Sequence, residues 1–289
     1  MSGGEILGPR VAGSWYEADP DRLRGQLDEF LRPEDDTPDE SGGRILALIV
    51  PHAGYTWSGA VAGRGFRHLR GRACDRVLLI GPSHHAGFPG AALPGASAYR
   101  TPLGDVPIDA ESVERAGRIP GIRIEDAPFR PEHCLEMEIP FLQHTLRPGW
   151  RLLPVLIGGG SGSEDCARVA DALRPLVGPE TLIVVSSDFT HYGPQFGYVP
   201  FRESVPERIR DLDQGAVDRI LASDPAGFDT YVARTGATIC GRRPIGVLFG
   251  LLPPRAEARL VAYDTSGQMS GDWHHSVSYA SVLFREVAA

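Results

Sequence analysis

The sequence contains no cluster of basic residues and no long hydrophobic run. Its 289 residues carry a formal net charge of −8, whereas binding to nucleic acid or to an anionic membrane would require clustered Lys and Arg. The longest apolar runs, such as RILALIV and IGVLFGLL, fall far short of the about 20 residues that cross a bilayer. The first residues also lack the basic and then apolar layout of a signal peptide. We therefore expect a cytoplasmic protein that binds neither nucleic acid nor membrane.

Cysteine is scarce, and its spacing shows no pairs. The four cysteines stand far apart, at positions 74, 134, 166 and 240. This low number without paired spacing argues against both a disulfide scaffold and a zinc ribbon. Hydrophobic residues make up 42% of the chain, an ordinary globular composition, and the length is ample for one sizeable core.

Apolar runs alternate with amphipathic segments along the chain. Strands are expected at 44–50, 76–81, 151–158, 181–187, 258–263 and 276–284, and helices at 19–31, 163–176, 206–222 and 224–235. The first four strands are continuously apolar, as in a sheet buried on both faces. The pattern predicts a single α/β domain over 1–289, with a mixed or mostly parallel central sheet covered by helices on both faces. The acidic segment 32–43 is expected to form a surface loop.

Residue types that can bind metals or transfer protons follow three of the predicted strands. His52 follows the first strand, His84 and His85 follow the second, and Asp188 and His191 follow the fourth. In open α/β sheets, sites form beyond the carboxyl ends of the strands. Imidazole and carboxylate together suit Zn, Fe, Cu or Ni. One such histidine alone would more often be an ordinary loop residue, but the repeated placement favours a metal or acid–base site.

Cys240 precedes a predicted buried helix that has Pro244 in its first turn. A cysteine at a helix N-terminus beside Arg242 and Arg243 is expected to have a lowered thiol pKa. Its thiolate would be a ligand for a soft or borderline metal. The alternative is a buried structural cysteine, which is also what we expect of the other three.

The segment PEHCLEMEIPFL brings His133, Glu136 and Glu138 close together. On a helix, His133 and Glu136 would share a face. They could then orient a metal ligand or accept a proton. The alternative is a solvated turn without a functional role.

Eight short motifs together resemble the Memo family, of the AmmeMemoRadiSam system protein B type. They run in order from Trp15 to Tyr279: SWYEAD, PHAGYTWSG, GPSHH, YRTPLGDVPID, EHCLEMEIPF, SSDFTHYG, TICGRRPIGV and SVSYA. The family is similar in fold to the class III extradiol ring-cleaving dioxygenases. Each motif alone is modest, but the ordered set is highly specific.

The resemblance implies roles for individual residues. The metal ligands would be His52, His84 and Cys240, while Asp188 and His191 would line the pocket and handle protons, His191 as the acid–base catalyst. The expected pocket and supporting residues are Trp15, Tyr55, His85, His133, Glu136 and Arg242. His85 is expected to point away from the ion and to support the surrounding loops.

The same resemblance implies candidate cofactors and functions. Because a cysteine replaces the carboxylate that completes the dioxygenase site, ring cleavage does not follow from the fold. Two histidines and a cysteine suit Fe(II) first, with copper or zinc as alternatives. We expect a metal-dependent oxidoreductase acting on a small substrate. The alternatives are a phosphopeptide-binding module, which would use Arg242 and Arg243, and an accessory partner of a radical-SAM protein.

Overall fold

A computed structural model of the protein describes residues 4–33 and 43–286. The loop expected at 32–43 therefore lies mostly outside the described residues. In the described part, a nine-stranded sheet has the order β10-β12-β2-β9-β3-β8-β4-β7, with β11 paired to β12. Its central strands are β2 (Ile45–Val50), β9 (Thr181–Ser186), β3 (Arg76–Pro82) and β8 (Arg151–Ile157). These four run parallel, and their buried residues explain the continuous apolar runs.

Shorter and antiparallel strands extend this sheet on both sides. They are β12 (Ser276–Glu286), β11 (Ala256–Thr265), β10 (His191–Tyr192), β4 (Ala91–Leu93) and β7 (Ile122–Ile124). β12 runs antiparallel to β2 and to β11, so the sheet is mixed. A small separate sheet consists of β1 (Ile6–Leu7), β5 (Ala98–Thr101) and β6 (Gly104–Pro107).

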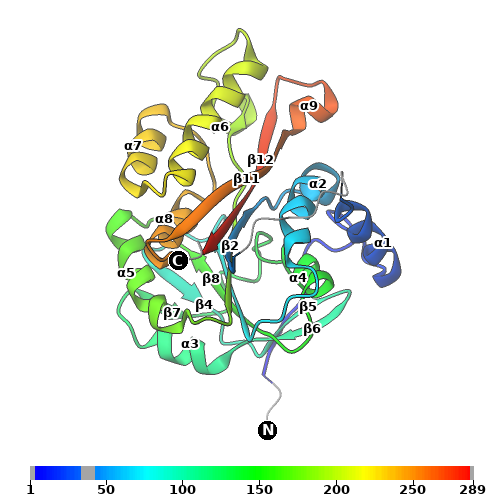
Figure 1. The fold of residues 1–289 in the computed structure, drawn as a ribbon, viewed down its shortest axis with the longest axis vertical. Helices are drawn as coiled ribbons and strands as arrows, with labels where there is room; N and C mark the ends of the chain where they lie inside the picture. The colour runs from blue at the N-terminus through cyan, green and yellow to red at the C-terminus, as the bar shows by residue number, and fades with distance from the viewer. Residues whose placement is uncertain (1–3, 34–42, 287–289) are drawn as a thin grey trace.

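Helices cover both sides of the central strands (Figure 1). They are α1 (Pro20–Phe30), α2 (Tyr55–Phe66), α3 (Ala110–Gly117), α4 (Ile139–Thr145), α5 (Ser163–Leu173), α6 (Val205–Leu221), α7 (Pro225–Thr235), α8 (Arg242–Leu251) and α9 (Ser266–Ser270). Helix α8 packs against β3 and β9 and is covered by α5, whereas α2 packs against β2 and β12 and is covered by α1 and α4. The α/β architecture predicted from the sequence is thus confirmed.

The helix starts follow from the local sequence. Asp19 accepts hydrogen bonds from the backbone N–H groups of Asp21 and Arg22, so it caps α1 directly before Pro20. Asp224 caps α7 in the same way before Pro225. Helix α2 was not expected, because its glycine-rich sequence lacks both a clear amphipathic pattern and a side-chain cap. Within the described ranges, no helix is long and apolar enough to span a membrane.

Glycine at position 63 permits the close crossing of α1 and α2. A Cβ atom at Gly63 would lie 2.3 Å from the carbonyl oxygen of Phe30, a backbone atom that cannot rotate away. Gly25, on the exposed face of α1, has no atom within 4 Å of the same added Cβ. Since α2 begins three residues after His52, this crossing also fixes the loop that carries His52.

We predict that Gly63→Ala lowers the free energy of unfolding by about 1–3 kcal/mol, because the added methyl group overpacks the helix crossing. The matched variant Gly25→Ala should raise it by up to about 1 kcal/mol, since alanine favours an exposed helix. Urea denaturation of both variants measures the difference. Equal effects in the two variants would contradict the packing argument.

Candidate metal centre

Three loops meet at the carboxyl edge of the central sheet. The parallel strands β2, β9 and β3 are immediate neighbours. His52 lies two residues beyond the end of β2, Asp188 two beyond β9 and His84 two beyond β3. Residues far apart in sequence thus leave the sheet side by side, as the sequence predicts.

Three imidazole rings form a cluster at this edge. The ligand-type nitrogens of His52, His84 and His133 all lie within 4.8 Å of one another, so the group could hold a metal ion. The rings of His84 and His133 stack with centroids 4.9 Å apart. The ring of His52 stands nearly perpendicular to both, at 5.3 and 5.6 Å. His52 is buried and the other two are partly accessible, so the cluster opens toward solvent on one side.

Cys240 reaches this cluster from the N-terminus of α8. Its Sγ lies 3.3 Å from Nε2 of His52 and accepts a hydrogen bond from the backbone N–H of Asp188 at 3.2 Å. The approach depends on Gly241, where an added Cβ would lie 2.2 Å from the Cβ of Ser187. The Gly241 N–H also donates to the Ser187 hydroxyl. The start of α8 is therefore pressed onto the turn that follows β9.

The spacing between Cys240 and His52 fits two ligands of one cation. A nitrogen at about 2.1 Å and a sulfur at about 2.3 Å from an ion lie about 3.1 Å apart at a right angle and about 3.6 Å apart in a tetrahedron. The observed distance of 3.3 Å falls between these values. Without an ion, the same distance allows the thiol to donate a hydrogen bond to Nε2.

Burial keeps His52, His133 and the thiol of Cys240 uncharged. It lowers the pKa of His52 well below the usual histidine value, and neighbouring His84 and His133 lower it further. Burial also lowers the pKa of His133 to about 4. The lowered thiol pKa expected for Cys240 is wrong: burial and the carboxylate of Asp188 raise the pKa of this thiol well above its usual value. A bound cation would act in the opposite direction and favour the thiolate.

Glu132 holds the imidazole of His84 and the backbone of His133 in place. One of its carboxylate oxygens lies 2.8 Å from Nδ1 of His84 and the other accepts the His84 backbone N–H at 2.7 Å. The backbone N–H groups of His133 and Cys134 also donate to it. Burial opposes ionisation of Glu132, but the bonds with His84 dominate and lower its pKa to about 2. His84, Glu132 and Cys134 also lie close enough together to hold a metal ion. The carboxylate of Glu132, however, is already engaged by these hydrogen bonds.

Asp188 and His191 lie beside the cluster with defined hydrogen bonds. Oδ1 of Asp188 accepts the backbone N–H of His52 at 2.9 Å, which ties the β2 loop to the β9 loop. Burial raises the pKa of Asp188, and His191 opposes this effect. Nδ1 of His191 lies 2.9 Å from the carbonyl oxygen of Phe189 and 3.0 Å from that of Thr238. Because both partners can only accept, Nδ1 carries a proton and Nε2 is left to exchange one.

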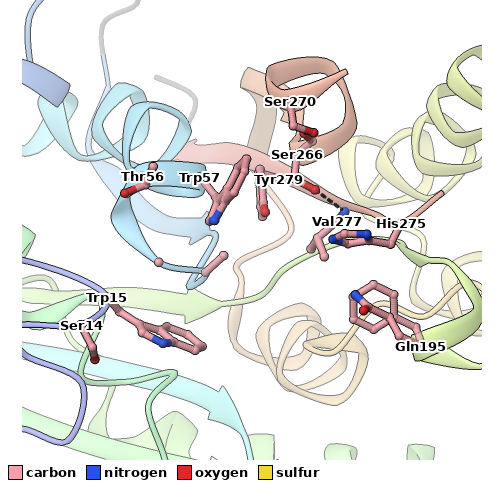
Figure 2. Close-up of a pocket in the computed structure, with 13 residues that line it drawn as sticks. Ser14, Trp15, Thr56, Trp57, Gln195, Ser266, Ser270, His275, Val277 and Tyr279 are labelled. Atoms are coloured by element: carbon pink, nitrogen blue, oxygen red, sulfur yellow. Dashed lines mark hydrogen bonds between the residues drawn. The ribbon is translucent and has the colours of Figure 1, made fainter. Parts of the chain in front are cut away.

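A cleft of about 450 Å³ adjoins the cluster (Figure 2). Figure 2 shows the indole rings of Trp15 and Trp57 on one side of the opening and His275 and Gln195 on the other. The ring of Trp15 lies 4.7 Å from that of His133, and Phe196, which also lines the cleft, lies 5.2 Å from His191. The cleft therefore reaches the imidazoles from the solvent side.

Comparison with known proteins decides the family. The model of the family described as Memo-like protein matches residues 8–283. The chain belongs to this family. The Protein memo-1 homolog of Caenorhabditis elegans is 34% identical over 94% of this chain and 81% of its own length. The MEMO1 family protein of Thermococcus onnurineus is 32% identical, covering 96% of this chain and 99% of that protein. Protein MEMO1 of Rattus norvegicus is 32% identical, covering 93% and 94%.

The segment before α4 of this Memo-like chain is not helical, although a helix was considered for His133 and Glu136. Residues 131–138 form turns, and α4 begins only at Ile139. His133 and Glu136 therefore do not share a helix face. His133 faces the imidazoles, whereas the carboxylate of Glu136 accepts the backbone N–H groups of Arg10 and Val11 and the hydroxyl of Tyr16.

The remaining expected residues lie farther from the ligand atoms. The Tyr55 hydroxyl donates to the carbonyl oxygen of Met137, and its ring packs among buried aromatic rings. His85 is exposed, with its ring centroid 6.5 Å from that of His84. Arg242 pairs with the carboxylate of Asp229 at 2.5 Å instead of facing the cleft.

Sequence reasoning missed several residues that build the site. Glu132 could have been noticed as the acid directly before His133. Ser186, whose Oγ lies 2.7 Å from Nδ1 of His52, is hidden within an apolar strand. Trp57 stands in the PHAGYTWSG motif but was not singled out. Phe196 and His275 carry no local signal, because only the tertiary fold brings them to the cleft.

The lowered pKa of His133 predicts a stability change with pH. In an unfolded chain the histidine pKa is about 6.5, compared with about 4 in the folded protein. Between these values only the unfolded chain binds the proton, so stability is lost as the pH falls from 6.5 to 4, by about 3 kcal/mol in total. Urea denaturation of the metal-free protein across this range should show the loss, and His133→Asn should reduce its slope. An unchanged slope in the variant would contradict the assignment.

Proposed function

We propose that this protein is a metal-dependent oxidoreductase with one metal centre per chain. The observation that carries the proposal is the position of Cys240 Sγ 3.3 Å from Nε2 of His52, whose ring is grouped with those of His84 and His133. His52, His84 and Cys240 would bind the ion, and His133 is a further nitrogen within reach. A metal bound there would supply a Lewis acid and, if it is iron or copper, a one-electron redox centre.

The donor set favours Fe(II), with copper or zinc as alternatives. Imidazole suits all three metals, and thiolate adds electron density that favours redox-active ions. Fe(II) is preferred because the similar dioxygenase fold holds that ion with two histidines and a third, anionic ligand. Three protein ligands would leave positions open to a small molecule that enters from the cleft.

His191 is the residue best placed to transfer a proton. Its Nδ1 proton is held by two backbone carbonyl groups, so the ring orientation is fixed and Nε2 is free to accept. Asp188 fixes the loop of His52 through the backbone N–H. Asp188 would thus support the geometry of the site.

The cleft supports a small substrate with an apolar part. Trp15 and Trp57 are 38% and 42% exposed, so their rings are available to a ligand at the opening. A phosphopeptide role has less support, because both Arg242 and Arg243 face the carboxylate of Asp229. Their charge is thereby largely compensated.

We predict that protein prepared without oxygen and stripped of metal binds one Fe(II) per chain, and that Cys240→Ala weakens this binding at least about 100-fold, since it removes a direct ligand. Competition with a chromophoric chelator measures the affinity, and elemental analysis measures the stoichiometry. Parallel titrations with Cu(I) and Zn(II) rank the metals.

The matched control is Cys166→Ala. Cys166 is also a buried free cysteine, but it lies on α5 and its pKa is raised to about 11 by burial. This variant should bind iron as the unmodified protein does. Equal affinities in both cysteine variants would refute the proposed ligand set.

A further inference from the structure

A single buried hydroxyl group has three polar partners behind the metal site. Oγ of Ser186, the last residue of β9, lies 2.7 Å from Nδ1 of His52. It also lies 2.8 Å from Oε1 of Glu138 and 2.8 Å from the carbonyl oxygen of Cys134. A hydroxyl group offers one hydrogen and two lone pairs. Three partners at these distances use the hydrogen and both lone pairs.

The chemistry of the partners assigns each proton. The carbonyl oxygen of Cys134 can only accept, so it takes the hydrogen of Ser186. The other two partners must then donate to Oγ. We infer that Glu138 is a neutral carboxylic acid that donates to Ser186, and that together they hold His52 as the tautomer with hydrogen on Nδ1. The lone pair of Nε2 is then directed toward Cys240 and the metal position.

An ionised Glu138 that accepts from Ser186 would leave buried polar groups without partners. If Ser186 donated to an ionised Glu138, the carbonyl oxygen of Cys134 would lose this hydrogen bond. The charge would also be fully buried, since Glu138 is 0% exposed. Its second oxygen, Oε2, has no hydrogen-bond partner in the described part of the chain. An unpartnered anionic oxygen costs far more free energy than an unpartnered carbonyl oxygen.

The other groups around Glu138 agree with a neutral acid. Burial raises the pKa of Glu138 well above the usual glutamate value, and the negative charge of Asp188 raises it further. Tyr55 packs nearby and also has a raised pKa, so it remains an uncharged phenol. On the other side of the ring, Sγ of Cys240 lies 3.3 Å from Nε2 of His52, so both the sulfur and a cation placed there would face an unprotonated Nε2 in this tautomer.

Glu138 is thus a positioning residue, which acts through Ser186 on His52. This inference deepens the proposed function, because a metal ligand needs the correct nitrogen unprotonated and the ring held still. The neutral acid does so without placing a second negative charge behind the site. Glu132 orients His84 as a carboxylate, so the two imidazoles are supported by acids in opposite protonation states.

Infrared difference spectroscopy of the metal-free protein tests the inference directly. At pH 7, unmodified protein minus Glu138→Gln should show the C=O stretching band of a protonated carboxylic acid. Unmodified protein minus Glu132→Gln should show only ionised carboxylate bands, because the pKa of Glu132 is about 2. Absence of the acid band in the first comparison would overturn the inference.

The nitrogen-15 spectrum of unmodified, metal-free protein provides a test that needs no stable variant. With His52 assigned, Nδ1 should carry hydrogen and Nε2 should have the shift of an unprotonated ring nitrogen. The reverse tautomer would overturn the inference even if every substitution unfolded the protein.

Zinc titration tests the consequence for the site. Ser186→Ala should weaken Zn(II) binding about 10- to 100-fold, since it removes the group that orients a ligand. Glu138→Gln should change it less than about threefold, because the amide N–H can donate to Ser186 as the acid does. Equal losses in both variants would overturn the donor role. If the unmodified protein bound no metal but showed the acid band, the proposed function would fail and the proton assignment would stand.

Discussion

The site depends on the contact between the start of α8 and the turn after β9. Gly241 has no side chain, so its backbone lies against Ser187, and this brings Cys240 within 3.3 Å of the imidazole of His52. The parallel strands β2, β9 and β3 bring the remaining residues to the same edge. The hydrophobic core under this edge is built from these strands, so the forces that stabilise the sheet also fix the spacing of the donor atoms.

Burial disfavours the charged forms of His52, His133 and Cys240, and this has an energetic cost. Imidazoles that must stay unprotonated reduce stability in mild acid, and a protonated thiol must lose its proton before it can bind a cation. Glu132 and Ser186 accept hydrogen bonds from Nδ1 of His84 and of His52, so Nε2 of these two rings is left for the centre. The arrangement suits a cation, because a positive ion would satisfy donor atoms that otherwise face one another.

Much of this could be predicted from the sequence, and the failures have physical reasons. The apolar runs at β2, β3, β8 and β9 identified the buried strands, and the histidines that follow β2 and β3 were placed at the shared edge. The pairing of Arg242 with Asp229 could not be foreseen, since 13 residues separate them and the contact is tertiary. The predicted thiol pKa of Cys240 failed because burial and the charge of Asp188 outweigh the helix N-terminus. The different directions of His133 and Glu136 were missed because 131–138 forms turns, so helical spacing does not apply.

The identity of the sulfur ligand tests the account most directly. X-ray absorption of protein loaded with one Zn(II) per chain should show one sulfur at about 2.3 Å together with nitrogen ligands. The sulfur should disappear in Cys240→Ser and remain in Cys134→Ser. A spectrum without sulfur, or one whose sulfur is lost in Cys134→Ser instead, would show that the ion binds elsewhere and would contradict the convergence of His52, His84 and Cys240 on one cation.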